Sequence, residues 1–230
     1  TVLYEDYFRK YSASSEVASF SMSKSYISAL IGIAISEGFI KDENEPVTKY
    51  ILELKGKYTW DKVTIHNLLQ MNSGVKSTES YTSPFSGAAA MYYGTNLRRQ
   101  LANAQTYREP GSGFEYKSIN TQMLGLILER ATGKTISQNL EEKIWQPLGM
   151  EYDASWSLDK RKNGIEKAFC CINATARDFA RFGRLYLHGG NWNGRQIVPS
   201  EWVKRSTQVN TELNSECYYN LQWWRASNTD

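Results

Sequence analysis

The feature that most constrains the fold is an apolar helix near the start of the chain. Five apolar residues recur at the i, i+3, i+4, i+7, i+8 spacing of a core-facing helical stripe: Ile27, Leu30, Ile31, Ala34 and Ile35. Gly38 follows the last apolar turn, where a glycine commonly ends a helix. The spacing therefore predicts a helix that buries an apolar face in the core.

Composition excludes several classes of function. A chain of 230 residues, 41% hydrophobic and 22% charged, is long enough to bury a core. The formal net charge is only +3 and basic residues alternate with acidic ones, so we expect no nucleic-acid partner. The longest apolar run, residues 27–35, is about half the length that crosses a bilayer, so we expect no membrane-spanning segment.

Cysteine and histidine are too few for metal chemistry. The three cysteines include an adjacent pair, Cys170 and Cys171, and cannot make a disulfide framework. Only two histidines are present, His66 and His188, and they form no cluster with the spacing of zinc ligands. We therefore expect neither a metal ion nor another cofactor.

Periodicity and turn residues predict the remaining elements. Strands are expected at the very start of the chain and before the first helix, and a further strand at its end: residues 1–11, 17–20 and 218–224. Helices are expected over residues 64–71, 88–104, 123–133 and 136–145, within residues 173–190, and after Ser200, which we predict as a cap. Thr175 and Asp178 have the spacing of a capped helix start. No repeat or linker divides the chain, so we predict a single domain over residues 1–230.

Ser21 and Lys24 stand at the start of the apolar helix. The Ser-x-x-Lys pattern occurs three times, and the other two pairs fall in loop-like sequence: Ser73/Lys76 and Ser157/Lys160. Only in the first pair do residues three apart lie on one helical face, within reach of each other. A cation in the first turn opposes the helix macrodipole at a cost of about 0.3–1 kcal/mol. The same position helps a lysine to become neutral.

A neutral Lys24 can act as a base toward Ser21. Its amine could take the hydroxyl proton as Ser21 attacks a carbonyl carbon, while backbone N–H groups at the helix start face the developing oxyanion. The alternative is that Ser21 only caps the helix and Lys24 extends to solvent.

Tyr116 and Ser118 form a second candidate pair, in "FEYKSINTQMLG". Residues two apart on an extended segment project from the same side, here just before another helix. The Tyr116 hydroxyl could relay a proton to the leaving group, and Ser118 could bind the lysine or the substrate. The alternatives are packing for Tyr116 and a helix cap for Ser118.

Together these motifs resemble the serine beta-lactamase and penicillin-binding-protein superfamily, in particular its class C-like branch with esterases and the 6-aminohexanoate-dimer hydrolase. The motifs occur in order: "SFSMSKS", "HNLLQMNSG", "EPGSGFEYKSINTQMLGLILERATGK", "IWQPLGM" and "FCCINATARDFARFGRLYLHGGNWNGRQIVP". The resemblance implies an α+β fold, with an antiparallel sheet flanked by helices and a largely helical region over about residues 39–170. It also implies Ser21 as nucleophile, Lys24 as base and Tyr116 as proton relay.

The chain departs from the family pattern in two ways. Ser118 stands where the Tyr-x-Asn box has asparagine, which looks more like the esterase and amide-hydrolase members. The family's Lys/His-Ser/Thr-Gly strand has no counterpart, and the chain begins in mid-strand. We therefore expect an excerpt of a longer protein that lacks both sheet-forming ends and is inactive alone.

The sequence thus predicts a serine hydrolase that forms an acyl-enzyme on a small ester or amide. A non-catalytic binding or sensor domain on the same fold is the alternative. A Ser-His-Asp hydrolase is disfavoured because no G-x-S-x-G motif is present. A tryptophan pair on a strand is more often core than cleft, so Trp223 and Trp224 are not among the predicted site residues. The resemblance suggests a bacterial protein of the periplasm or cell envelope, and the oligomeric state stays open.

Overall fold

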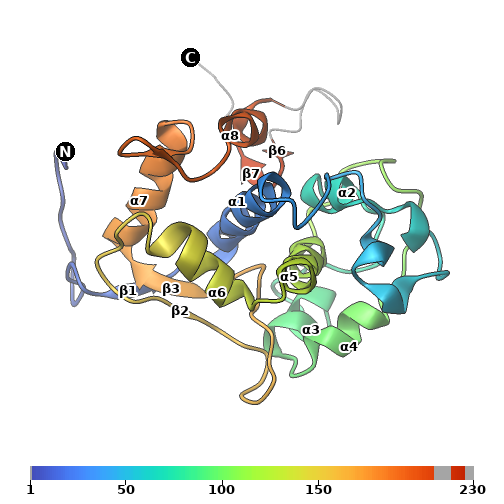
Figure 1. Cartoon of the computed structure of the whole chain (residues 1–230). Helices are drawn as coiled ribbons and strands as arrows, with labels where there is room; N and C mark the ends of the chain where they lie inside the picture. Colours follow the sequence, from blue (N-terminus) through green and yellow to red (C-terminus); the bar gives the residue numbers. More distant parts are fainter. Residues whose placement is uncertain (1, 210–218, 226–230) are drawn as a thin grey trace.

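Helix α1 (Ser23–Ser36) lies at the centre of the structure, a computed structural model that describes residues 2–209 and 219–225 (Figure 1). The predicted helix is therefore present, and Gly38 follows it with a φ of +79°. Every residue from Ser23 to Ala34 is buried, so the helix is enclosed on all sides rather than along one stripe. Helix α5 (Ser118–Thr132) packs beside it and is buried from Ser118 to Leu128.

A small antiparallel sheet leads into α1. Its strands are β1 (Glu16–Ala18), β3 (Ile172–Thr175) and β2 (Ser155–Trp156), in the order β1-β3-β2. In the register, Val17 pairs with Ala174 and Ser155 pairs with Asn173. The central strand β3 thus holds the end of β1 at the position where the chain turns into the helix.

The predicted strand over residues 1–11 is wrong in its described part. Residues 2–15 contain no strand, and most of their side chains are exposed, including Leu3 at 95%. An apolar and aromatic pattern forms a strand only where a neighbouring strand completes its hydrogen-bond ladder. Within the described residues, no strand pairs with this segment.

A helical region follows α1 in sequence. It contains three short 3₁₀ turns, η2 (Val47–Lys49), η3 (Leu52–Leu54) and η4 (Trp60–Lys62), and three helices that pack on α5, namely α2 (Ile65–Leu69), α3 (Gly87–Tyr93) and α4 (Leu97–Ala102). The single helix predicted over residues 88–104 is wrong, because α3 and α4 are separate. Gly94 is extended, and a Cβ there would lie 2.2 Å from the Ala90 carbonyl oxygen. Asn96 then caps α4.

The second half of the chain adds helices and two hairpins around the sheet. The helical elements are α6 (Ile136–Leu140), the π-helical turn η5 (Glu141–Trp145), α7 (Ala176–Leu187) and α8 (Ser200–Thr207). The hairpins pair β4 (Asn191–Trp192) with β5 (Arg195–Gln196), and β6 (Tyr219–Asn220) with β7 (Trp223–Trp224). Thr175 caps α7 as predicted, whereas Pro199 is the cap of α8 and Ser200 its first residue.

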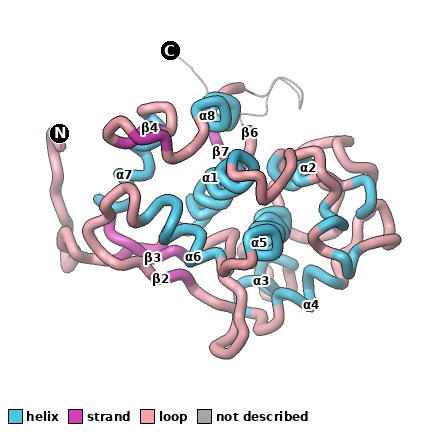
Figure 2. The backbone as a smooth tube through the Cα atoms, viewed as in Figure 1, coloured by secondary structure: helices cyan, strands magenta, loops and turns pink. Residues whose placement is uncertain are grey.

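The elements share one hydrophobic core, and the predicted combination of antiparallel sheet and flanking helices is confirmed. Figure 2 shows how small a share of the chain the strands occupy beside the helices. Gln222, in the turn between β6 and β7, ties the terminal hairpin to this core: its side chain bonds Thr121 of α5 and the Leu68 and Leu69 carbonyls of α2. No helix among the described residues is both long and apolar enough to cross a membrane.

Candidate active site

Ser21 lies in the tight turn that joins β1 to α1. The turn is 3₁₀-helical over Phe20–Met22, and Phe20 has a φ of +45°, which non-glycine residues rarely adopt. Two hydrogen bonds fasten the turn to β3: the Ser19 N–H donates to the Ile172 carbonyl at 2.7 Å, and the Ile172 N–H donates to the Ser19 hydroxyl at 3.1 Å. The result is an exposed serine on a fixed backbone.

Lys24 reaches back from α1 to Ser21. Its Nζ donates to the Ser21 Oγ at 3.0 Å and to the Phe169 carbonyl at 2.8 Å. The residue is 2% exposed, and Nζ lies 5.1 Å from the centre of the Tyr116 ring. Burial lowers the pKa of this amine to about 8, against a smaller opposing effect from the Glu79 carboxylate. Lys24 therefore does not extend to solvent, and its amine loses its proton far more readily than an exposed lysine.

The Tyr116 ring also packs against the Lys24 amine. Burial raises the pKa of its phenol, while a hydrogen bond with Ser21 acts in the opposite direction. The phenol thus stays protonated near neutral pH and lies within reach of the serine hydroxyl. Its ring also packs 5.5 Å from the ring of Trp224. The structure therefore brings Ser21, Lys24 and Tyr116 together.

Ser118 lies in the same cavity as Ser21 but does not act as a cap. Lys117 is the N-cap of α5, and Ser118 is the first helical residue. Its hydroxyl donates to the Glu79 carboxylate, and its N–H donates to the same carboxylate at 2.9 Å. The cap interpretation is wrong because Glu79, from the long loop before α3, satisfies the first turn of α5. Sequence reasoning missed Glu79, since nothing in the loop marks it.

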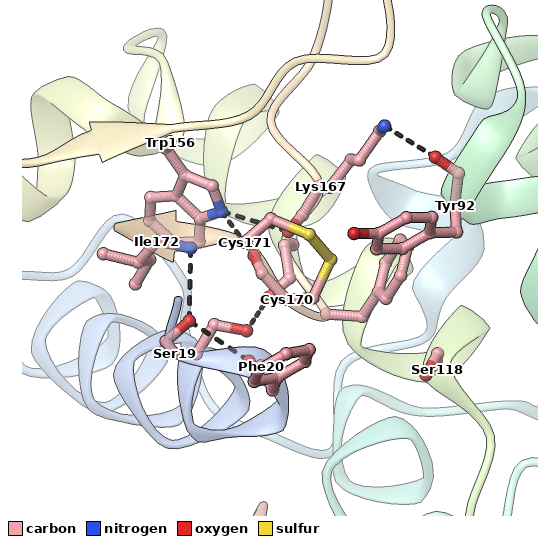
Figure 3. The surroundings of a disulfide bond; sticks show 12 residues. Ser19, Phe20, Tyr92, Ser118, Trp156, Lys167, Cys170, Cys171 and Ile172 are labelled. Carbon is pink, nitrogen blue, oxygen red and sulfur yellow. Dashed lines mark hydrogen bonds between the residues drawn. A yellow bond between two sulfur atoms is a disulfide. The ribbon is translucent and has the colours of Figure 1, made fainter. Parts of the chain in front are cut away.

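The loop before β3 contributes a backbone carbonyl to the site. The Phe169 carbonyl of this loop accepts the hydrogen bond from Lys24. A disulfide joins the next two residues, Cys170 and Cys171 (Figure 3). The adjacent cysteines were visible in the sequence, but a bond between neighbours was not foreseen, and a backbone carbonyl leaves no signal in a sequence.

Two cavities of about 230 Å³ each open on Ser21 from different sides. One has a largely aromatic wall, in which Ser118 and Cys170 also take part: Phe20, Tyr81, Tyr92, Tyr93 and Phe169. The other is lined by Lys24 and Tyr116 together with residues of the terminal hairpin: Tyr219, Gln222, Trp223 and Trp224. The preference for a core position is therefore wrong for Trp224, which is 59% exposed. It holds for Trp223, which packs against the hydrophobic core on Phe182 and Tyr186 while also lining this cavity.

The two histidines lie in other environments. His66 of α2 contacts the Glu43 carboxylate at 3.2 Å, and His188 is the C-cap residue of α7. Among residues 2–209 and 219–225, no group of three or more histidine, cysteine or acidic residues could hold a metal ion. The titratable groups gathered at Ser21 are instead the Lys24 amine, several tyrosine phenols including that of Tyr116, and the Glu79 carboxylate bonded to Ser118.

A helical region beside an antiparallel sheet, with a serine and a buried lysine at the start of the central helix, defines the class of this protein. The family model named Beta-lactamase matches residues 1–230, and the chain belongs to this family.

Individual relatives are similar to this chain in sequence, and one of them also in structure. The 6-aminohexanoate-dimer hydrolase of Paenarthrobacter ureafaciens is 32% identical over 228 residues, which cover 90% of this chain and 57% of that protein. Esterase EstB of Burkholderia gladioli is 34% identical over 122 residues, which cover 46% of this chain and 30% of the esterase. A solved Bacillus anthracis structure, described as a candidate 6-aminohexanoate-dimer hydrolase, has a TM-score of 0.85 and 32% identity over 96% of this chain and 61% of its own. The chain thus spans little more than half the length of the first of these relatives.

Proposed function

We propose that the intact protein is a serine hydrolase that forms an acyl-enzyme on a small ester or amide. The observation that carries this proposal is the hydrogen bond from Lys24 to Ser21, made by a buried amine with its pKa lowered to about 8. A lysine with this pKa is partly neutral near neutral pH and can act as a general base. An exposed lysine, with a pKa of about 10.4, could not.

The proposed reaction begins with proton transfer from Ser21 to Lys24. As the proton moves to the Lys24 amine, the Ser21 oxygen forms a bond to the substrate carbonyl carbon, and negative charge collects on the carbonyl oxygen. The Ser21 N–H is the backbone donor suited to that charge, because the N–H groups of Met22 and Ser23 already donate to carbonyls within the turn. The bond from the carbonyl carbon to the leaving group then breaks as the Tyr116 phenol gives its proton to the leaving group and takes one back from the Lys24 ammonium. The acyl group remains on Ser21, and Lys24 is neutral again. Water releases the acyl group by the same proton path in reverse.

The size of the two cavities beside Ser21 favours a small substrate. A volume of about 230 Å³ accommodates a short acyl or leaving group, and the aromatic wall of the Tyr81 side favours an apolar one. The Ser118 hydroxyl donates to Glu79, so its free lone pairs would accept a hydrogen bond from a substrate N–H or O–H. The names of the relatives, a 6-aminohexanoate-dimer hydrolase and an esterase, agree with a carbonyl substrate of this kind.

Labelling with a fluorophosphonate tests the nucleophile. We expect the intact protein to form one adduct, mapped by peptide mass spectrometry to Ser21, and Ser21→Ala to abolish it. Ser157→Ala is the matched control, because it removes the serine of another Ser-x-x-Lys pair and should label normally. An adduct at another residue, or labelling that persists in Ser21→Ala, would refute the mechanism. Loss of all labelling in the native protein would favour a binding or sensor domain instead.

Substitution of the lysine tests the base. Lys24→Arg should abolish labelling, because a guanidinium keeps its proton near neutral pH. Lys160→Arg, in the control pair, should leave labelling unchanged. Tyr116→Phe should reduce ester turnover by about 10²–10⁴-fold, the usual contribution of a positioned proton donor. Turnover retained in Lys24→Arg would mean that another group takes the serine proton.

A further inference from the structure

The segment of residues 167–172 leads from the candidate site into β3, whose first residue is Ile172, and its backbone carbonyls are hydrogen-bonded one after another. Each successive carbonyl from Ala168 to Ile172 accepts a hydrogen bond, in turn from the Ser23 hydroxyl, Lys24 Nζ, the Trp156 indole, the Ser157 N–H and the Ser19 N–H. Two of these donors belong to the first turn of α1, and one of them is the candidate base. A displacement of this loop would therefore act directly on Lys24.

Phe169 encloses Lys24 in two ways. Its carbonyl accepts from Nζ at 2.8 Å, and its ring centre lies 5.9 Å from the same atom. Together with the Tyr116 ring at 5.1 Å, it keeps water from the amine. Burial is the main cause of the lowered pKa of Lys24, so this enclosure is what makes the amine a usable base.

The disulfide follows Phe169 directly and fixes an unfavourable backbone. Cys171 has a φ of +74°, which a residue with a Cβ rarely adopts and which glycine usually supplies. The bond between Cys170 and Cys171 closes a small ring around their peptide unit, and this restricts rotation of the backbone at both residues. Figure 3 shows the bond beside Phe20 and Tyr92, and Cys170 lines the cavity that contains Ser21. Cys170 is therefore the half of the bond that a small reductant in this cavity would meet.

We propose that the Cys170–Cys171 disulfide is a positioning element for Lys24, and that its reduction slows acylation of Ser21. This inference rests on the function proposed for Ser21 and Lys24. A dithiol reductant supplies two electrons and two protons, is itself oxidised to a disulfide, and leaves Cys170 and Cys171 as thiols. The released loop withdraws the Phe169 carbonyl and ring, and water reaches the amine. Its pKa then rises toward that of an exposed lysine, and less of it is neutral at neutral pH.

The experiment compares acylation rates of the intact protein in three states across pH 6–10: oxidised, reduced with dithiothreitol and desalted, and reoxidised. In the oxidised protein, the rise of the acylation rate with pH should have its midpoint near pH 8. The reduced protein should show a midpoint about one pH unit higher and acylation at pH 7 about tenfold slower, since each unit changes the neutral fraction tenfold. Reoxidation should restore both. The other titratable groups facing this site are the same in all three states: Glu79, Tyr81, Tyr92, Tyr93, Tyr116 and Tyr219.

Variants separate the disulfide from general effects of the reductant. Cys170→Ser/Cys171→Ser should behave like the reduced protein and ignore dithiothreitol. Cys217→Ser removes the third cysteine, which lies outside the described residues, and should retain the response to reduction. If the double variant does not fold, reduction and reoxidation of the native protein still test the inference. Equal rates and midpoints in the oxidised and reduced states, with two free thiols verified by alkylation and mass spectrometry, would overturn the inference.

A second readout distinguishes this failure from failure of the proposed function. Competitive acetylation of Lys24 by acetic anhydride reports the pKa of its amine without any need for catalysis. If Ser21 takes no fluorophosphonate in any state, the proposed function fails, but the midpoint of Lys24 acetylation should still rise on reduction. A midpoint that does not move refutes the role of the disulfide, whether or not Ser21 is acylated.

Discussion

Replacement of Lys24 by methionine should change how stability depends on pH. Burial lowers the pKa of Lys24 from its ordinary value of 10.5 to about 8 in the folded protein. Between these values the unfolded chain binds more protons than the folded one, so the free energy of unfolding rises with pH. From pH 7 to pH 9.5, linkage gives the native protein a gain of about 2 kcal/mol that Lys24→Met lacks. Below pH 8 the charged amine destabilises the fold to its full extent.

Chemical denaturation of both proteins at pH 7, 8 and 9.5 measures this difference. The Lys24→Met substitution also removes the hydrogen bonds to Ser21 and Phe169, but that loss adds nearly the same amount at each pH and cancels in the slope. Lys160→Met, on the surface, should give a curve parallel to that of the native protein. Parallel curves for Lys24→Met and the native protein would show that the pKa of Lys24 is not lowered by folding, and the argument for a lysine base would fall with it.

Two further predictions concern the electrostatics of the site and the packing of α1. Glu79→Gln should lower the pKa of Lys24, because the carboxylate raises it, and the midpoint of acylation should move to lower pH by less than about one unit; a higher midpoint would contradict this. Gly32→Ala should destabilise the protein by about 1–3 kcal/mol in thermal unfolding, since its Cβ would lie 2.5 Å from the Trp202 ring. Gly183→Ala is the matched control in an open helical position, and should stabilise by about 0.5–1 kcal/mol.

The sequence predicts the site best where the chemistry is local. Ser21 and Lys24 are three residues apart at a helix start, and Thr175 and Asp178 have the spacing of a cap, so periodicity and propensity alone place them. The meeting of Tyr116 with Lys24 is not local, and it followed from the family resemblance rather than from spacing. The structure now places the ring 5.1 Å from the amine.

The features of the site and fold that the sequence does not predict depend on contacts between distant segments. A single sequence does not encode such contacts in any local pattern. Glu79 reaches Ser118 across 39 residues, and the Phe169 carbonyl reaches Lys24 across 145. The break between α3 and α4 depends on the close approach of Gly94 to the Ala90 carbonyl. Trp224 lines the site because its hairpin lies against Tyr116, whereas a tryptophan considered alone is more often buried.

The polar start of α1 has one physical explanation that joins fold and site. Three consecutive side chains donate to carbonyls of other segments: Ser23 to Ala168, Lys24 to Phe169 and Ser25 to Gln222. These carbonyls are buried against the helix and would otherwise be unsatisfied, at a cost of about 1–3 kcal/mol each. A carboxylate, the usual residue of a first helical turn, accepts hydrogen bonds and could satisfy none of them. The donors that attach α1 to the loop before β3 and to the terminal hairpin therefore also fix the amine beside Ser21, and a helix enclosed on all sides has to begin with them.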